Sequence, residues 1–248
     1  MTKTAIITGA TSGIGKACAY MLAKNNYNII ITGRRKERLD ELEKELSNVK
    51  VLKLNFDIRD RQETEKQIQN LPKEWKNIDL LINNAGLASG LSDIQDGDID
   101  QWEQMIDTNV KGLLYISRQI MPIMVANKKG HIVNISSIAG KETYGKGNVY
   151  CGTKHAVEAI TKGMRIDMLP YGIKVTSIAP GMVDTEFSTV RLGNKEAADK
   201  VYEGFTPLYA EDIADTVEFV ITRPAHVNIN EMLVMPTAQA TATNTFKQ

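Results

Sequence analysis

The feature that most constrains the fold is a short apolar segment near the amino terminus that runs directly into a glycine-rich turn. Thr4 to Thr8 is predicted to be a strand, and Gly9-Ala-Thr-Ser-Gly13-Ile-Gly15 follows it. A helix is then expected to about Asn25. A strand, a tight turn and a helix in this order form the unit from which parallel sheets are built.

The same alternation continues along the chain. Further strands are predicted at 28–32, 49–56, 78–83, 131–137, 172–179 and 228–235, and helices at 35–47, from about 60, up to about 124, and at 148–169 and 210–222. This order predicts an α/β fold, a single Rossmann-type doubly wound parallel sheet with helices on both faces. Right-handed crossovers then place the ligand-binding loops at the carboxyl ends of the strands.

We expect residues 1–248 to form one dinucleotide-binding catalytic domain, since this length suits a single large core. Residues from about 186 to 206 are polar and contain Gly193-Asn194, and they are predicted to form a substrate lid. Residues from about 236 to 248 are small and polar and are predicted to be a C-terminal tail.

Charge and cysteine usage exclude several classes of protein. Lysine plus arginine equals aspartate plus glutamate at 30 each, which gives no electrostatic basis for binding nucleic acid or an anionic membrane. Cys18 and Cys151 both fall within predicted helices, which favours reduced thiols and a cytoplasmic location. No apolar run is long enough to be a signal peptide or to span a bilayer. The three histidines are scattered, so no metal site is predicted.

The glycine-rich turn is suited to binding a pyrophosphate. Gly9 permits the tight turn, Gly13 allows the phosphates to approach the backbone, and Gly15 allows the helix to pack on the strand. Thr11 and Ser12 add hydroxyl donors. Any strand-to-helix turn can use glycine, but the position after the first strand favours a cofactor.

The ends of the second and third strands bear on which dinucleotide binds. Arg34 and Arg35 stand where a site for the plain ribose of NAD is expected to carry an acid, so they suit the 2′-phosphate of NADP. The alternative is a solvated basic face at the start of a charged helix. Asp57 either accepts from an adenine amine or caps the helix that begins near Asp60.

The candidate catalytic group is Ser137 with Tyr150 and Lys154. Ser137 ends a predicted strand, and the other two share a helix face because they are four residues apart. A lysine ammonium about 4 Å from a phenol is expected to lower its pKa by about 3 units from ~10. The spacing alone is weak evidence, since Tyr20 and Lys24 share it on what is taken as an ordinary helix face. Asn109 either makes a local backbone bond or marks a kink that directs a carbonyl or side chain toward Lys154.

Taken together, Thr8-Gly-Ala-Thr-Ser-Gly-Ile-Gly15, Asn83-Asn-Ala-Gly86, Asn109, Ser137, Tyr150-x-x-x-Lys154 and Pro180-Gly181 resemble the short-chain dehydrogenase/reductase family. The resemblance implies that Tyr150 is the general acid/base, that Ser137 orients the substrate, that Lys154 lowers the tyrosine pKa and binds the nicotinamide ribose, and that Asn109 holds a proton-relay water. It also implies a homotetramer. The residues predicted to bind NADP are Gly9, Thr11, Ser12, Gly13, Ile14, Gly15, Arg34, Arg35, Asp57, Ile58, Asn84, Ala85, Gly86, Tyr150, Lys154, Pro180, Gly181, Val183 and Thr185.

A narrower similarity concerns the substrate. Gly33-Arg34-Arg35, Leu71 to Asp79, Thr185 to Arg191 and Pro224 to Asn230 are similar to the NADP-dependent 3-hydroxy acid dehydrogenases. This similarity implies oxidation of serine or 3-hydroxypropionate, or the reverse reaction on malonic semialdehyde. Ser137, Tyr150 and Arg191 are then predicted to bind the substrate, with the guanidinium holding its carboxylate. A reductase of neutral ketones or 3-oxoacyl thioesters, and a non-catalytic nucleotide-sensing protein, are the alternatives.

Overall fold

A seven-stranded parallel sheet forms the centre of the computed structural model, which describes residues 2–248. The strands lie in the order β3-β2-β1-β4-β5-β6-β9, and each neighbouring pair is parallel. Their bounds are Thr4–Ile7 for β1, Asn28–Gly33 for β2, Val51–Asn55 for β3, Leu80–Asn83 for β4, His131–Ile135 for β5, Lys174–Pro180 for β6 and Glu231–Val234 for β9. The predicted doubly wound sheet is therefore confirmed.

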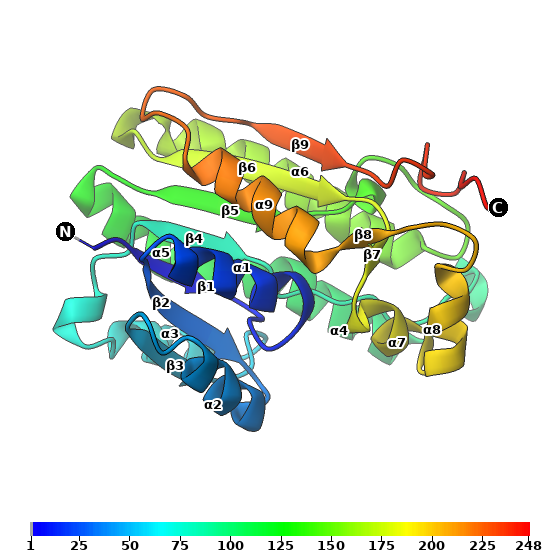
Figure 1. The fold of residues 1–248 in the computed structure, drawn as a ribbon, viewed down its shortest axis with the longest axis horizontal. Helices are drawn as coiled ribbons and strands as arrows, with labels where there is room; N and C mark the ends of the chain where they lie inside the picture. The colour runs from blue at the N-terminus through cyan, green and yellow to red at the C-terminus, as the bar shows by residue number, and fades with distance from the viewer. Residues whose placement is uncertain (1) are drawn as a thin grey trace.

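Helices cover both faces of this sheet (Figure 1). They are α1 Gly13–Lys24, α2 Lys36–Glu45, α3 Arg61–Gln69, α5 Leu113–Asn127, α6 Asn148–Met168 and α9 Ala210–Ile221, whereas α4 Ile99–Ile106 packs on α6. Successive side chains of a strand point to opposite faces, so Ile29 and Ile31 pack with α1, α2 and α9, whereas Ile30 packs with α3, α5 and α6. Burial on both faces explains why the inner strands β1, β2 and β4 are almost continuous apolar runs.

The strand order reverses direction between β1 and β4. From β1 the chain proceeds to β2 and β3 on one side, and then returns to place β4, β5 and β6 on the other. The loops that leave the carboxyl ends of β1 and β4 consequently diverge and leave a crevice between them. Open α/β sheets bind their ligands in this crevice.

A π-helix interrupts the long helix that was predicted to end near residue 124. It spans Asp107–Gly112 and joins α4 to α5 without a break. Because α4 precedes it, the segment that holds Asn109 lies inside a longer helical run and does not start one. Short 3₁₀ turns occur at Lys73–Trp75, Ile94–Asp96, Ile138–Gly140 and Leu169–Tyr171.

The predicted lid contains two short helices, α7 Glu186–Leu192 and α8 Lys195–Val201. A two-stranded parallel pair, β7 Val183–Asp184 and β8 Leu208–Tyr209, lies at its base and was not predicted from the sequence. In the C-terminal tail, Gln239 is buried and contacts the turn that follows β6. Within residues 2–248 no helix is long and apolar enough to cross a bilayer, and no cluster of metal-ligating side chains is present.

Candidate functional site

A cavity of about 650 Å³ opens at the carboxyl ends of the strands. The loops after β1, β2, β3, β4, β5 and β6 line it, together with α7 and part of the C-terminal tail. Of the predicted site residues, all except Gly15 and Asn109 line this cavity: Gly9, Thr11, Ser12, Gly13, Ile14, Arg34, Arg35, Asp57, Ile58, Asn84, Ala85, Gly86, Ser137, Tyr150, Lys154, Pro180, Gly181, Val183, Thr185 and Arg191. Residues from the whole length of the chain thus meet in one place.

The glycine turn forms a close-packed cradle at one end of the cavity. Gly9 adopts a φ of +67°, and a Cβ added there would lie 3.0 Å from the Cα of Ala85. A Cβ on Gly15 would lie 2.4 Å from the carbonyl oxygen of Gly9, so this glycine allows α1 to pack against the turn, whereas the sequence predicted packing against the strand. The Asn84 side chain donates to the carbonyls of Thr8 and Gly9 and holds the turn in place.

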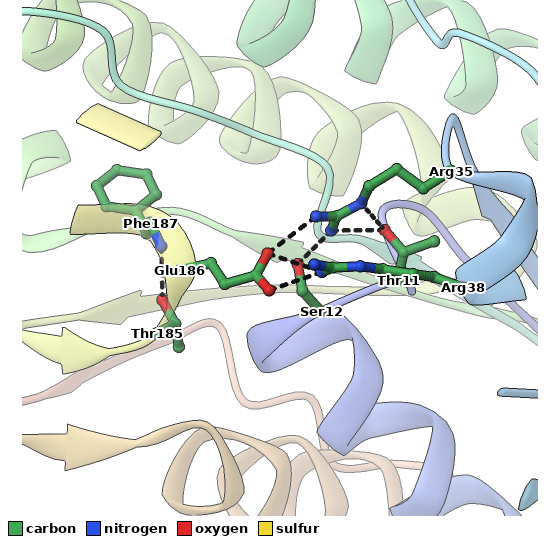
Figure 2. A network of polar contacts seen from close by, with 7 residues as sticks. All are labelled: Thr11, Ser12, Arg35, Arg38, Thr185, Glu186 and Phe187. Atoms are coloured by element: carbon green, nitrogen blue, oxygen red, sulfur yellow. Dashed lines mark hydrogen bonds and ion pairs between the residues drawn. The ribbon is translucent and has the colours of Figure 1, made fainter. Parts of the chain in front are cut away.

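Arg35 lies against this turn and joins it to the lid (Figure 2). Its guanidinium donates to the hydroxyls of Thr11 and Ser12, at 2.9 and 2.7 Å, and to the Glu186 carboxylate at 2.9 Å. Arg38 donates to the same carboxylate at 2.6 and 2.8 Å. The sequence drew attention to Arg34 and Arg35 but not to Arg38 or Glu186, because residues 148 positions apart give no local pattern.

Asp57 does not cap the following helix, so that alternative is wrong. Asp60 caps α3, because its side chain accepts from the backbone N–H of Glu63. Asp57 instead accepts from the Arg59 guanidinium at 2.7 Å and lies 3.6 Å from that of Arg34. Partial burial raises the pKa of Asp57, but the hydrogen bonds from Arg59 outweigh burial and hold the pKa below its usual value. A carboxylate therefore stays ionised at this edge of the cavity.

The predicted catalytic side chains meet at the other end of the cavity. Ser137 follows β5, and its hydroxyl accepts from the backbone N–H of Ala139 at 3.1 Å. Tyr150 and Lys154 lie one turn apart on α6 and are 7% and 6% exposed. The Lys154 ammonium donates to the carbonyl of Ile135 at 3.0 Å, which ties α6 to the end of β5.

Burial governs the protonation of this pair. It raises the pKa of Tyr150 above its ordinary value, while the Ser137 hydroxyl and the Arg191 guanidinium oppose that rise. It also lowers the pKa of Lys154 to about 8, against the opposing influence of Glu158. The expectation from the sequence was a pKa of Tyr150 brought toward neutrality by Lys154, whereas in this structure desolvation of the phenolate outweighs Ser137 and Arg191 and the pKa is raised.

Asn109 is buried in the π-helix and makes three hydrogen bonds. Its side chain accepts from the N–H of Leu87 and donates to the carbonyl of Leu87, both at 2.8 Å, and it donates to the Thr153 hydroxyl at 3.0 Å. The local backbone bond considered from the sequence is therefore wrong. A Cβ added to Gly86 would lie 3.2 Å from Asn109 Oδ1 and 3.5 Å from Lys154 Nζ, so both side chains reach the same backbone segment.

Arg191 comes from α7 and lies over two aromatic rings. Its guanidinium carbon is 5.4 Å from the ring centre of Tyr150 and 5.5 Å from that of Tyr144. Nη1 donates to the Tyr144 hydroxyl at 2.9 Å, whereas Nε and Nη2 are buried and have no hydrogen-bond partner in the described part of the chain. Tyr144 was missed from the sequence, because a single tyrosine in a polar loop forms no pattern.

Two further cavity residues were also missed. Phe187 packs beside the ring of Tyr150, with the two ring centroids 5.7 Å apart. Gln239 accepts from the N–H of Met182 at 2.8 Å, and its Oε1 would lie 2.4 Å from a Cβ on Gly181. Gly181 is therefore required for close packing of the tail beneath the cavity, whatever else it contacts.

Comparison with known proteins gives one consistent result. The family model for short chain dehydrogenases matches residues 3–195. The NADP-dependent 3-hydroxy acid dehydrogenase of Salmonella typhi is 46% identical over 96% of both chains, and the serine 3-dehydrogenase of Rhizobium radiobacter is 43% identical over 98% of this chain and 97% of its own. The closed form of a serine dehydrogenase complexed with NADP⁺ superimposes with a TM-score of 0.92 at 42% identity, covering 99% of this chain and 100% of that one. This chain therefore belongs to the short chain dehydrogenase family, as its resemblance predicted.

Proposed function

We propose that this protein transfers a hydride between NADP and the hydroxyl carbon of a short 3-hydroxy acid of the serine or 3-hydroxypropionate type. The observation that carries the proposal is Arg191, whose Nε and Nη2 are buried without partners in the described residues, beside the ring of Tyr150. Unpaired buried donors of a charged group are costly, and a carboxylate satisfies two of them at once. The similar proteins named for 3-hydroxy acids and serine support this substrate class.

The residues around the cavity fit NADP. Gly9 and Gly13 adopt φ angles of +67° and +50° that favour glycine, and a Cβ on them would lie 3.0 Å from Ala85 and 3.2 Å from Thr185, so this close-packed turn requires glycine at both positions. The hydroxyls of Thr11 and Ser12 lie at this turn, and Arg34 and Arg35 supply positive charge suited to a 2′-phosphate. When bound, the nicotinamide accepts or returns the hydride.

The side chains on the opposite side of the cavity would handle the substrate proton. Ser137 would hold the substrate oxygen, and Tyr150 would take its proton during oxidation or return it during reduction. Lys154 would bind the nicotinamide ribose and add positive charge near the phenol. Asn109 would fix the Leu87 backbone and Thr153, and so keep the wall of the site in place.

We further propose a homotetramer that works in the cytoplasm. Cys18 and Cys151 are free and buried, which suits a reducing compartment. Large apolar side chains are exposed on the helices that flank the site: Ile99, Ile106, Leu114, Ile166 and Leu169. Subunit contacts would cover them.

The substrate proposal is tested by replacing Arg191 with alanine. Loss of one partner of a desolvated charged pair costs about 2–5 kcal/mol. The substitution should therefore lower kcat/KM for serine or 3-hydroxypropionate by at least about 25-fold, and leave a neutral ketone or aldehyde nearly unaffected. Arg61→Ala, at the exposed start of α3, is the matched control. Equal losses on acidic and neutral substrates would remove Arg191 from carboxylate binding.

A further inference from the structure

The guanidinium groups of Arg35 and Arg38, beside the glycine turn, bind a carboxylate of the protein itself, that of Glu186. Glu186 accepts from Nη1 of Arg35 at 2.9 Å and from Nη1 of Arg38 at 2.6 Å (Figure 2). The same Arg35 guanidinium is held by the hydroxyls of Thr11 and Ser12 over the turn. Because this is where the 2′-phosphate of NADP is proposed to bind, Glu186 and that phosphate compete for the same donors.

Glu186 also belongs to α7, the helix that carries Arg191, which is proposed to bind the substrate carboxylate. It is the first residue of α7, and Arg191 lies five residues later on the same short helix. The preceding Thr185 packs on the glycine turn, since a Cβ on Gly13 would lie 3.2 Å from it. One end of α7 is thus fastened to the cofactor turn by Glu186, while the other end places a guanidinium over Tyr150.

The ion pair between Arg35 and Glu186 is of a kind that a bound anion can replace. The side chains of Arg35 and Glu186 are 41% and 46% exposed, and exposed pairs of this kind contribute little to stability. The carboxylate carries one negative charge against two guanidiniums. A phosphate monoester carries about −1.5 to −2 and three acceptor oxygens, so it neutralises the two arginines more completely.

We propose that Glu186 is an internal counter-anion that the 2′-phosphate of NADP displaces from Arg35 and Arg38, which makes the position of α7 depend on that phosphate. This inference rests on the proposed function, since it takes Arg35 to be part of the 2′-phosphate site. NAD, which lacks the phosphate, leaves the Glu186 contacts in place. Glu186 is therefore a specificity-determining residue that links cofactor choice to the helix carrying Arg191.

The binding test compares Glu186→Gln with the wild type. The dissociation constants of NADPH and NADH are measured by fluorescence at one ionic strength. Removing the competing charge should tighten NADPH binding by about 2–5-fold, the range expected for an exposed ion pair, and leave NADH unchanged. Glu37→Gln is the matched control, because Glu37 adjoins Arg38 but makes no ion pair within residues 2–248. Unchanged or weaker NADPH binding in Glu186→Gln, or an equal gain in Glu37→Gln, would overturn the role of Glu186.

A second measurement follows the helix itself. Amide hydrogen exchange of residues 186–192 in the wild type should respond to 2′-AMP but not to 5′-AMP, and in Glu186→Gln the difference should disappear. The same response to both nucleotides would overturn the link to α7.

The variant Arg35→Ala separates this inference from the proposed function. If Arg35→Ala leaves the preference for NADPH over NADH intact, the proposed 2′-phosphate site is wrong. If Arg35→Ala abolishes the preference but Glu186→Gln has no effect, only the present inference fails.

Discussion

Tyr150 illustrates how one side chain acquires its chemistry from its surroundings. A free phenol titrates near ~10, and burial in this cavity raises the pKa of Tyr150 further. The Ser137 hydroxyl and the Arg191 guanidinium act in the opposite direction, and they come from a strand end and from α7. The second tyrosine with the same spacing, Tyr20, is 41% exposed and donates to Glu45 on the surface. Position in the fold, and not spacing, distinguishes the two residues.

Replacing Tyr150 with phenylalanine should remove catalysis and spare cofactor binding. The phenolic proton moves in the proposed reaction, and general acid/base catalysis typically contributes about 10²–10⁴-fold. We expect a loss of that size in kcat and little change in the dissociation constant of NADPH. Tyr20→Phe should behave like the wild type. Near-normal turnover of Tyr150→Phe, or a matching loss in Tyr20→Phe, would show that the acid/base residue lies elsewhere.

At the scale of elements, β5 leads to Ser137 at its carboxyl end and holds a buried histidine at its start. His131 is 6% exposed, and its Nε2 lies 2.8 Å from the Thr176 hydroxyl of β6. Its Nδ1 is buried without a partner in the described residues. Burial, with a smaller contribution from Lys174, lowers the pKa of His131 to about 3. The strand that delivers Ser137 therefore contains an imidazole that must stay neutral.

Because the pKa of His131 is lowered in the folded state, we expect the folded protein to lose stability in acid. Between pH 6.5 and about 3 the unfolded chain binds a proton at His131 that the folded chain does not, so the free energy of unfolding decreases as the pH falls through that window. At pH 4.5 the contribution should be about 2–3 kcal/mol, from 1.36 kcal/mol per pH unit. Urea unfolding at pH 7 and pH 4.5, at fixed protein concentration, should show a smaller decrease for His131→Gln than for the wild type. The exposed His226→Gln should change nothing, and an unaltered decrease in His131→Gln would contradict the assignment.

At the scale of the whole molecule, apolar side chains are exposed on α5 and on α6, the helix that carries Tyr150 and Lys154. Ile166 is 72% exposed near the end of α6, and Leu169 immediately after it is 75% exposed. Leu114, at the start of α5, is 41% exposed. Contact between copies of the chain through these helices would bury this surface and also brace the segments that hold Tyr150 and Asn109.

The proposed tetramer can be tested by placing charges on this surface. Light scattering after size exclusion should give the mass of a tetramer for the wild type and a smaller species for the double variant Ile166→Glu with Leu169→Glu, because a charge in an apolar interface is strongly unfavourable. Val190→Glu, on α7 and 57% exposed, is the control and should remain tetrameric. A monomeric wild type would refute the tetramer, and an intact tetramer in the double variant would exclude this face as the contact.

The parallel sheet, the glycine turn and about half of the residues that line the cavity could be predicted from the sequence. These features follow from local patterns, since apolar runs mark buried strands and parallel strands end at one edge. Ser137, Tyr150 and Arg35 could be placed at that edge because each stands at a strand end or on the helix next to one. The two-residue strands β7 and β8 were missed because two residues carry no periodicity.

The contacts of the charged and polar groups of the site depend on how distant elements pack together. The pairing of Glu186 with Arg35 joins residues 151 positions apart, and that of Arg191 with Tyr144 joins residues 47 apart. Neither has a signature in the sequence, because hydrogen bonds between distant segments depend on how elements pack and not on local order. The direction of the pKa shift at Tyr150 was likewise wrong from the sequence. A sequence shows which charges can be near a phenol, whereas the cost of removing that phenol from water is set by the side chains that bury it.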